Sequence, residues 1–270
     1  TLIFTSCHGR EGFGSCDLFI SYKTGNEWSA PKNMGANVNS AEWDSQPSLS
    51  ADARVLYFVS TRKGGLGKQD IWVSYINEKG DWSKPKNLGN AINTPSNEIS
   101  PFIHPNGRTL YFSSNGHLGM GGFDIYSSDI DPEGYTKPLN FGYPVNDGKD
   151  QVSIFVTADG KNGYYSNECG EDAFTCSKLF WFEIPESKQV KFKSSFITGV
   201  VMDSITRKPL KATVDLYDVE KNQLLLSVES DAVTGEYLMV LTEGADYTLY
   251  VNSKGYLFKS EKFAYLTEKE

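Results

Sequence analysis

The chain has 270 residues, with 34 acidic and 26 basic side chains and a formal net charge of -8. This length fits one large or two modest domains, and 22% charged with 13% aromatic residues is a globular composition, not a disordered one. The acidic balance argues against a nucleic-acid partner, and no apolar run approaches the roughly 20 residues that a membrane-spanning helix needs.

An internal repeat dominates residues 1–184. Three markers return at steps of 53 or 54 residues, and separate markers share one period when a structural unit is repeated. The first is Leu2-Ile3-Phe4, Leu56-Tyr57-Phe58, Leu110-Tyr111-Phe112 and Gly163-Tyr164-Tyr165. The second is Asp17-Leu18-Phe19, Asp70-Ile71-Trp72, Asp124-Ile125-Tyr126 and Lys178-Leu179-Phe180. The third is Trp28-Ser29-Ala30-Pro31, Trp82-Ser83-Lys84-Pro85 and Tyr135-Thr136-Lys137-Pro138.

Each repeat is expected to form four short strands. In the second repeat, strand A covers 46–51, and strands B, C and D fall on the three markers in turn. Tight turns join A to B, and two of them carry Asn-Gly or Asp-Gly, which tolerate the positive φ of a hairpin turn. Four antiparallel strands in a repeat of this length predict a β-propeller blade. We therefore expect an all-β fold with a propeller over 1–193, its blades near 1–45, 46–97, 98–149 and 150–193.

The third repeat carries a family resemblance. Its residues 106–114 and 119–126, NGRTLYFSS and GMGGFDIY, resemble the PD40, or TolB-type, propeller repeat. The last repeat departs from this pattern, because Lys178 replaces the marker aspartate. The first repeat begins at strand B, and an open sheet edge is a liability for a propeller. We therefore expect further blade sequence before Thr1, in keeping with the missing initiator Met.

A second domain is expected at 194–270, where the period has stopped. Alternating apolar and polar residues at 213–216 are typical of a half-buried strand, and about six short strands would form a small β-sandwich. Gly199, Asp203, Pro209-Leu210 and Thr234-Gly235-Glu236-Tyr237 resemble the carboxypeptidase regulatory-like domain, a transthyretin-like sandwich. An unrelated immunoglobulin-like module is the alternative.

Four cysteines form two local pairs, Cys7 with Cys16 and Cys169 with Cys176. Their spacings differ from the C-x2-C knuckles that thiolate zinc sites use. Two disulfides are therefore expected, which implies an oxidising compartment. Free thiols or a metal site are the alternatives.

No catalytic, cofactor or metal site is expected. His8, His104 and His117 are not at metal-ligand spacing, and the sequence has no P-loop and no G-x-S-x-G or H-E-x-x-H pattern. The segment from Asp129 to Gly134 imitates the start of a calcium loop, but a hairpin turn is the expectation there, with calcium as the alternative.

The marker aspartates Asp17, Asp70 and Asp124 recur once per blade. A glycosidase needs unlike carboxyl groups gathered at one place, so this repetition predicts a role in building the blade. We expect each carboxylate to accept hydrogen bonds from the N–H groups of the neighbouring glycine loop.

Long loops are expected to gather on one face of the propeller. They are the B–C loops (7–16, 61–69, 114–123, 167–177) and the D–A connections (35–45, 89–97, 142–150). Loops on a rigid scaffold often carry function, and Trp43, Arg62 and His117 are the types of side chain that anchor interfaces. We therefore predict these three as partner-binding residues. For Trp43 the alternative is packing beneath its own loop.

The order of the two domains resembles the OmpA-family periplasmic lipoproteins of the type IX secretion machinery, the PorE-like proteins. The resemblance implies a non-catalytic periplasmic scaffold, associated with the outer membrane, whose partners are envelope proteins of the secretion machinery or an extended peptide. Peptidoglycan binding would belong to an OmpA-like domain that is not in this sequence. A periplasmic propeller that binds glycan or peptide is the alternative, and a divergent glycosidase is a third possibility.

Overall fold

The computed structural model describes residues 1–7, 12–77, 79–168, 177–243 and 245–265. Apart from one short 3-10 helix, η1 (Glu186–Lys188), the regular elements described are β-strands. The predicted Cys169–Cys176 disulfide lies outside the described residues. The chain divides into two compact units, the first formed by Thr1–Ser21 with Pro31–Val190 and the second by Tyr22–Ala30 with Lys191–Glu270.

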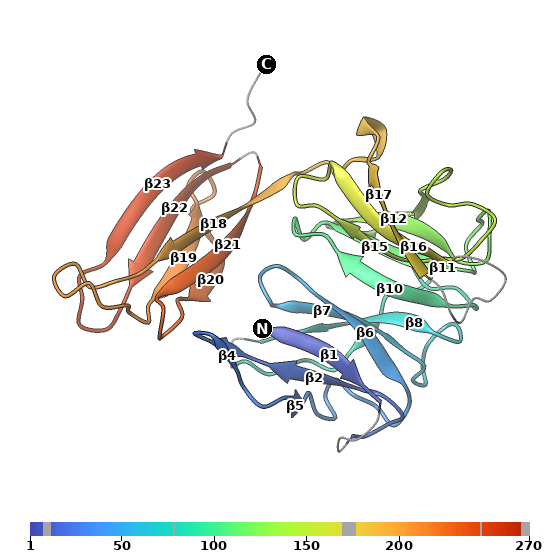
Figure 1. Cartoon of the computed structure of the whole chain (residues 1–270), viewed down its shortest axis with the longest axis horizontal. Coiled ribbons are helices and arrows are strands. Elements are labelled where there is room, and N and C mark those ends of the chain that lie inside the picture. The colour runs from blue at the N-terminus through green and yellow to red at the C-terminus, as the bar shows by residue number, and fades with distance from the viewer. Residues whose placement is uncertain (8–11, 78, 169–176, 244, 266–270) are drawn as a thin grey trace. The chain divides into compact units, whose positions relative to one another are not determined.

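The first unit consists of four consecutive antiparallel sheets, which confirms an all-β, propeller-like fold (Figure 1). Neighbouring sheets touch through their first strands, and each sheet contains three to five strands. The first sheet has the order β1 (Leu2–Ser6), β2 (Asp17–Ser21), β5 (Lys32–Asn33). The second has β6 (Asp44–Leu49), β7 (Val55–Ser60), β8 (Asp70–Tyr75), β9 (Lys86–Asn87). The third has β10 (Glu98–Ile103), β11 (Thr109–Ser114), β12 (Asp124–Asp131), β13 (Gly134–Tyr135), with β14 (Leu139–Asn140) also paired to β12. The fourth has β15 (Gln151–Val156), β16 (Asn162–Glu168), β17 (Ser177–Glu183).

The inner blades bury both faces of their sheets, because a blade packs on each side. In β7, Leu56 and Phe58 belong to a core shared with Leu18 of the first blade. The alternate residues, Tyr57 and Val59, belong to a core that continues into the third blade. Alternation along a strand sends successive side chains to opposite faces, which explains why the repeat is apolar at consecutive positions. Each contact between consecutive blades is called a joint below.

The three A–B turns lie where the sequence predicts them, two of them at Asn-Gly or Asp-Gly pairs. Ala53, Gly107 and Gly160 occupy their tips with φ of 57°, 67° and 71°. Strand A of the second blade begins at Asp44, two residues before the predicted start, and bulges at Gln46, where φ is 52°. The Gln46 side chain accepts a hydrogen bond of 2.8 Å from the backbone N–H of Ser100, so the bulge serves the second joint.

The outermost strand differs from its predicted place. In the third blade the marker's Tyr135 lies in β13, which pairs with the end of β12; in the first three blades a further pairing with strand C begins directly after the proline. Proline has no N–H to donate to a ladder, so the strand starts at the residues that follow Pro31, Pro85 and Pro138. These strands are β5, β9 and β14.

The second unit contains two sheets around one core. One sheet pairs β18 (Ser194–Val200) with β21 (Glu236–Thr242); the other has the order β20 (Gln223–Glu229), β19 (Thr213–Asp218), β22 (Ala245–Asn252), β23 (Lys259–Tyr265). Val214, Leu216, Met239, Leu241 and Leu249 are buried between them. The hairpin of β3 (Lys23–Thr24) and β4 (Glu27–Trp28) belongs to this unit. Within the described chain, we find no helix with the length and apolarity to cross a lipid bilayer.

Candidate partner-binding face

The glycine loops between strands B and C are built around the marker aspartates. In the second blade, the Asp70 carboxylate is buried and accepts hydrogen bonds from the N–H groups of Leu66, at 2.5 Å, and Gly67, at 3.0 Å. Asn87 of β9 donates to the same carboxylate at 3.0 Å. Asp17 accepts from Phe13 and Gly14, and Asp124 from Met120 and Gly121. A charged acceptor strengthens such bonds, so each aspartate fixes the loop that precedes it.

The same loops lock each blade to the next. A Cβ atom on Gly67 would overlap the carbonyl oxygens of Thr94 and Ser96, which belong to the connection leading into the third blade. Gly14 and Gly121 meet the equivalent connections equally closely. Backbone bonds complete the joint, since Lys68 donates to Ser96 at 2.8 Å. Only glycine permits this approach, which accounts for the second glycine of the repeated G-x-G-x-x-D pattern.

Three asparagines that the sequence reasoning missed complete the loop framework. The Asn93 side chain accepts from the backbone N–H of Ile71 at 2.9 Å and donates to its carbonyl at 2.9 Å, so the amide takes the place of a paired backbone. Asn39 and Asn146 make the same pair of bonds with Leu18 and Ile125. A repeated N-x-G-x-x-[VI]-N pattern, at 33–39, 87–93 and 140–146, was the available signal.

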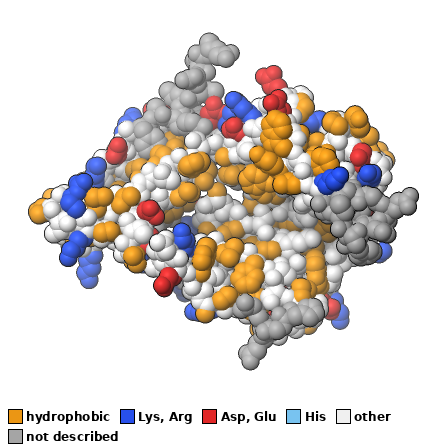
Figure 2. Space-filling model, viewed as in Figure 1, with side chains coloured by type: hydrophobic (Ala, Val, Ile, Leu, Met, Phe, Trp, Pro, Cys, Tyr) orange, Lys and Arg blue, Asp and Glu red, His pale blue; other side chains and the backbone are white. Residues whose placement is uncertain are grey.

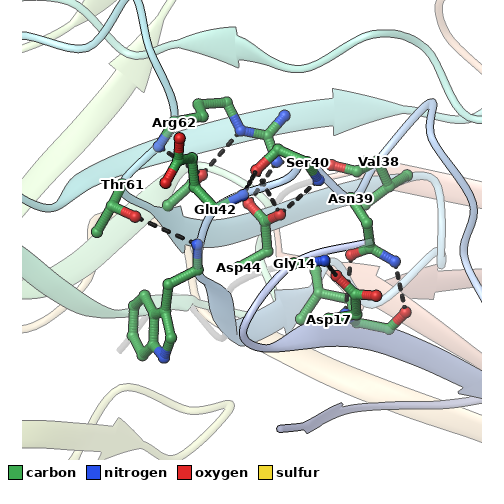
Figure 3. A network of polar contacts seen from close by, with 12 residues as sticks. Gly14, Asp17, Val38, Asn39, Ser40, Glu42, Asp44, Thr61 and Arg62 are labelled. Carbon is green, nitrogen blue, oxygen red and sulfur yellow. Dashed lines mark hydrogen bonds and ion pairs between the residues drawn. The ribbon is translucent and has the colours of Figure 1, made fainter. Parts of the chain in front are cut away.

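Arg62, a predicted partner-binding residue, spans the first joint (Figure 3). Its guanidinium donates to the Asp44 carboxylate at 2.5 Å and to the Val38 carbonyl at 2.6 Å. The group lies over the rings of Phe58 and Trp72, at 5.0 and 5.3 Å from their centroids. Asp44 is fully buried and the Arg62 side chain is 13% exposed. Breaking a buried pair of this kind leaves an uncompensated charge, so the pair fixes Arg62 within the second blade, and its bond to Val38 ties that blade to the connection from the first.

His117 occupies the same place at the second joint. Its Nε2 donates to the carbonyl of Ile92 at 2.7 Å, and Ile92 is the counterpart of Val38. The imidazole packs against Phe112 and Tyr126, with ring centroids 5.9 and 5.3 Å away. Arg62 and His117 therefore play equivalent roles. Each side chain extends from a B–C loop, packs on two aromatic rings and donates to a backbone carbonyl of the preceding D–A connection.

The backbone of Trp43 lies at the first joint with Arg62, whereas His117 belongs to the second joint. The Trp43 side chain is half-buried and packs against the core of the second and third blades. Its backbone exchanges two hydrogen bonds with Thr61, of 3.2 and 3.1 Å. The three predicted residues thus lie at the joints, beneath the loop surface.

Carboxylates at the start of strand A are also engaged. Glu98 is fully buried and accepts from Thr94 and Ser114, with distances of 2.7 Å. Asp131 accepts from the backbone N–H groups of Glu133 and Gly134, which is the geometry of a turn. Across the described residues, no three or more His, Cys, Asp or Glu side chains cluster as a metal site would require. This face therefore presents loops in fixed positions, and its buried carboxylates accept hydrogen bonds from the protein itself.

Large apolar side chains stand at the tips of the glycine loops. Phe13, Leu66 and Met120 occupy the same position, between the two glycines of G-x-G-x-x-D, and are 53%, 48% and 53% exposed. We call these three residues the loop tips. Leu118, beside Met120, is 97% exposed. Hydrophobic side chains reach the molecular surface at several places (Figure 2), but the loop tips recur at 53- and 54-residue steps.

A disulfide closes the glycine loop of the first blade. Cys7 follows β1 and Cys16 precedes β2, and their sulfur atoms are bonded. Cys16 also accepts a hydrogen bond of 3.0 Å from the backbone N–H of Asp44, so the bridge lies directly beside the first joint. The covalent bond limits the freedom of the loop that presents Phe13.

Comparisons with known proteins indicate distant similarity to β-propeller structures. No family model matches the chain, and no curated protein matches it. One solved structure with similarity is the GH43B protein of the xyloglucan PUL of Bacteroides ovatus, with 13% identity and a TM-score of 0.38 over 92% of this chain and 71% of that one. Another is the S511A mutant of puromycin hydrolase complexed with PGG, with 10% identity and a TM-score of 0.34 over 92% and 40%.

Proposed function

We propose that the chain is a non-catalytic scaffold that binds protein partners of a cell-envelope complex through its loop tips. The observation that carries the proposal is the recurrence of Phe13, Leu66 and Met120 as exposed side chains on loops held rigid from below. Single exposed apolar side chains are common on protein surfaces, but the same exposed position on three successive blades supports a shared role in binding. Rigid presentation lowers the ordering cost of binding.

The repeat resemblance and the disulfide support a place for this scaffold in the periplasm. PD40-type blades followed by a regulatory-like sandwich resemble the PorE-like proteins of the type IX secretion machinery, which are associated with the outer membrane. The Cys7–Cys16 bridge is in keeping with an oxidising compartment. In this proposal the partners are other components of that machinery.

The non-catalytic part of the proposal rests on the hydrogen bonds and the ion pair that the buried carboxylates already make. Asp17, Asp70 and Asp124 hold glycine loops, Asp44 is paired with Arg62, and Glu98 is bonded to two hydroxyl groups. General acid or base catalysis needs a carboxyl group that can reach substrate. Each of these groups is instead committed to the blade framework.

The test is a triple variant, Phe13→Ser with Leu66→Ser and Met120→Ser, used as bait in extracts of envelope proteins. Secretion-machinery components should co-purify with the unaltered chain and be lost from the triple variant. The control replaces Leu139 and Tyr143, which are 68% and 79% exposed but lie outside the loop tips, by Ser. Equal recovery by all three baits, or retention of oligosaccharides alone, would contradict the proposal.

A further inference from the structure

The second unit carries a groove on the outer face of its four-stranded sheet. Leu216 and Leu249 of the central strands β19 and β22 point into the core, so the alternate residues of these strands face outward. The groove over this face has a volume of about 750 Å³, which is within the range of small-molecule binding sites. It is called the sheet groove below.

Aromatic rings form the floor and rim of the sheet groove. Tyr217 and Tyr250 stand on neighbouring strands with ring centroids 5.2 Å apart and planes at 82°, so the two rings make a corner. Tyr250 is 40% exposed, and Phe258, from the segment that joins β22 to β23, is 70% exposed at the rim. Such rings present apolar faces to a ligand while the tyrosine hydroxyls remain available for hydrogen bonds.

Polar side chains alternate with these rings. The strand register places Asp215 opposite Tyr250 and Thr248 opposite Tyr217, and Asn252 follows at the next outward position of β22. Together they supply carboxylate, hydroxyl and amide groups around the tyrosine corner. None of the described residues that line the groove is Lys or Arg, so the site lacks the charge that a phosphate or carboxylate ligand would need.

The backbone of the sheet is already fully engaged beneath the groove. β19 pairs with β20 on one side and β22 on the other, and β22 pairs with both β19 and β23. An extended peptide that adds to a sheet needs an unpaired edge, which this face does not offer. A ligand here must be recognised by side chains, through stacking and hydroxyl hydrogen bonds.

We propose that the sheet groove binds a neutral oligosaccharide. A pyranose ring has an apolar face of C–H groups that stacks on tyrosine and a rim of hydroxyl groups that bond to carboxylate, amide and hydroxyl side chains. The tyrosine corner and the groups of Asp215, Thr248 and Asn252 provide both. This activity is separate from partner binding by the loop tips and does not depend on it.

The experiment is calorimetric titration of the full chain with β-1,4-linked hexamers of N-acetylglucosamine and of glucose. At least one hexamer should bind, and Tyr250→Ala should weaken its association about tenfold, the effect expected on losing one well-placed aromatic contact. Tyr217→Ala should weaken it comparably, and Tyr250→Phe should retain most of the binding. The matched control is Phe196→Ala on β18, since Phe196 is 63% exposed and lies outside the groove.

Circular dichroism of each variant verifies that the sheet is folded. Should Tyr250→Ala unfold, Asp215→Asn tests the same groove with little change in shape and should also reduce binding. Failure of both hexamers to bind would overturn the proposal, as would binding that Tyr250→Ala and Asp215→Asn leave unchanged. The chain is also titrated directly with decaproline; binding of decaproline without binding of either hexamer would overturn the proposal in favour of a peptide site.

Discussion

The second and third blades differ from the fourth in how they use the same apolar positions. Ile71 and Ile125, directly after the marker aspartate, are fully buried, whereas Leu179 at the equivalent position is 75% exposed. Tyr57 and Tyr111 are 4% and 1% exposed, against 36% for Tyr164. The repeat therefore supplies an apolar face to every blade, but burial depends on whether another sheet packs on that face. Each blade supplies one side of an interface, so the stability of a blade depends on the joints it forms with its neighbours.

The largest expected effect on stability comes from removing a buried side chain at a joint. Ile71→Ala removes a fully buried side chain from the core of the second and third blades, so the free energy of unfolding should fall by about 2–5 kcal/mol. Leu179→Ala at the equivalent exposed position should cost about 0.5 kcal/mol or less. Urea denaturation followed by tryptophan fluorescence measures both. Equal losses would show that the fourth blade is covered in solution.

A smaller effect is expected from the marker position. Asp70→Ala leaves the N–H groups of Leu66 and Gly67 without their acceptor, which should lower the free energy of unfolding by about 1–3 kcal/mol. The fourth blade has the exposed Lys178 at this position, and Lys178→Ala should be nearly neutral. Amide hydrogen exchange should accelerate at Leu66 and Gly67 in the Asp70 variant alone. Unchanged exchange there would refute a loop-holding role for the aspartate.

The smallest expected effect is a pH dependence of the free energy of unfolding that arises from one residue at the joint of the third and fourth blades. His104 is fully buried; its Nδ1 accepts from Asn106 and its Nε2 donates to the Thr157 carbonyl at 3.0 Å. Burial lowers the pKa of His104 below its ordinary 6.5. The unfolded chain therefore binds a proton first as the pH falls below 6.5, and the free energy of unfolding decreases until the lowered pKa is reached.

His104→Ser, which introduces the residue found at the same turn of the second blade, should flatten that part of the pH profile. Urea denaturation at several values between pH 7 and pH 5 measures the slope for both proteins. The second blade, with Ser50, contributes no such titration. A variant with an unaltered slope would assign the pH dependence to other groups.

The sequence predicted several features that repeat in chemistry, but the reasoning missed the repeated asparagines Asn39, Asn93 and Asn146. Contacts that repeat only in geometry gave no sequence signal. The aspartate markers and the A–B turns are found where periodicity placed them, because both depend on local backbone. Arg62 and His117 gave no shared signal, since two different residue types reach equivalent carbonyls across a joint. The strands β5, β9 and β14 begin later than the marker, because its proline interrupts pairing with strand C. Trp43 could not be assigned to surface or core without its neighbours.

In the proposed function, the regular spacing of Phe13, Leu66 and Met120 would give partner recognition a further property. Each tip would make a weak contact, but the blade repeat fixes the separation between one tip and the next, so a partner with matching pockets would engage them in sequence. After the first contact, the second would form at a high effective concentration. Affinity would then rise steeply with the number of tips engaged. The propeller would then select partners by the distance between their binding pockets as much as by the chemistry of those pockets.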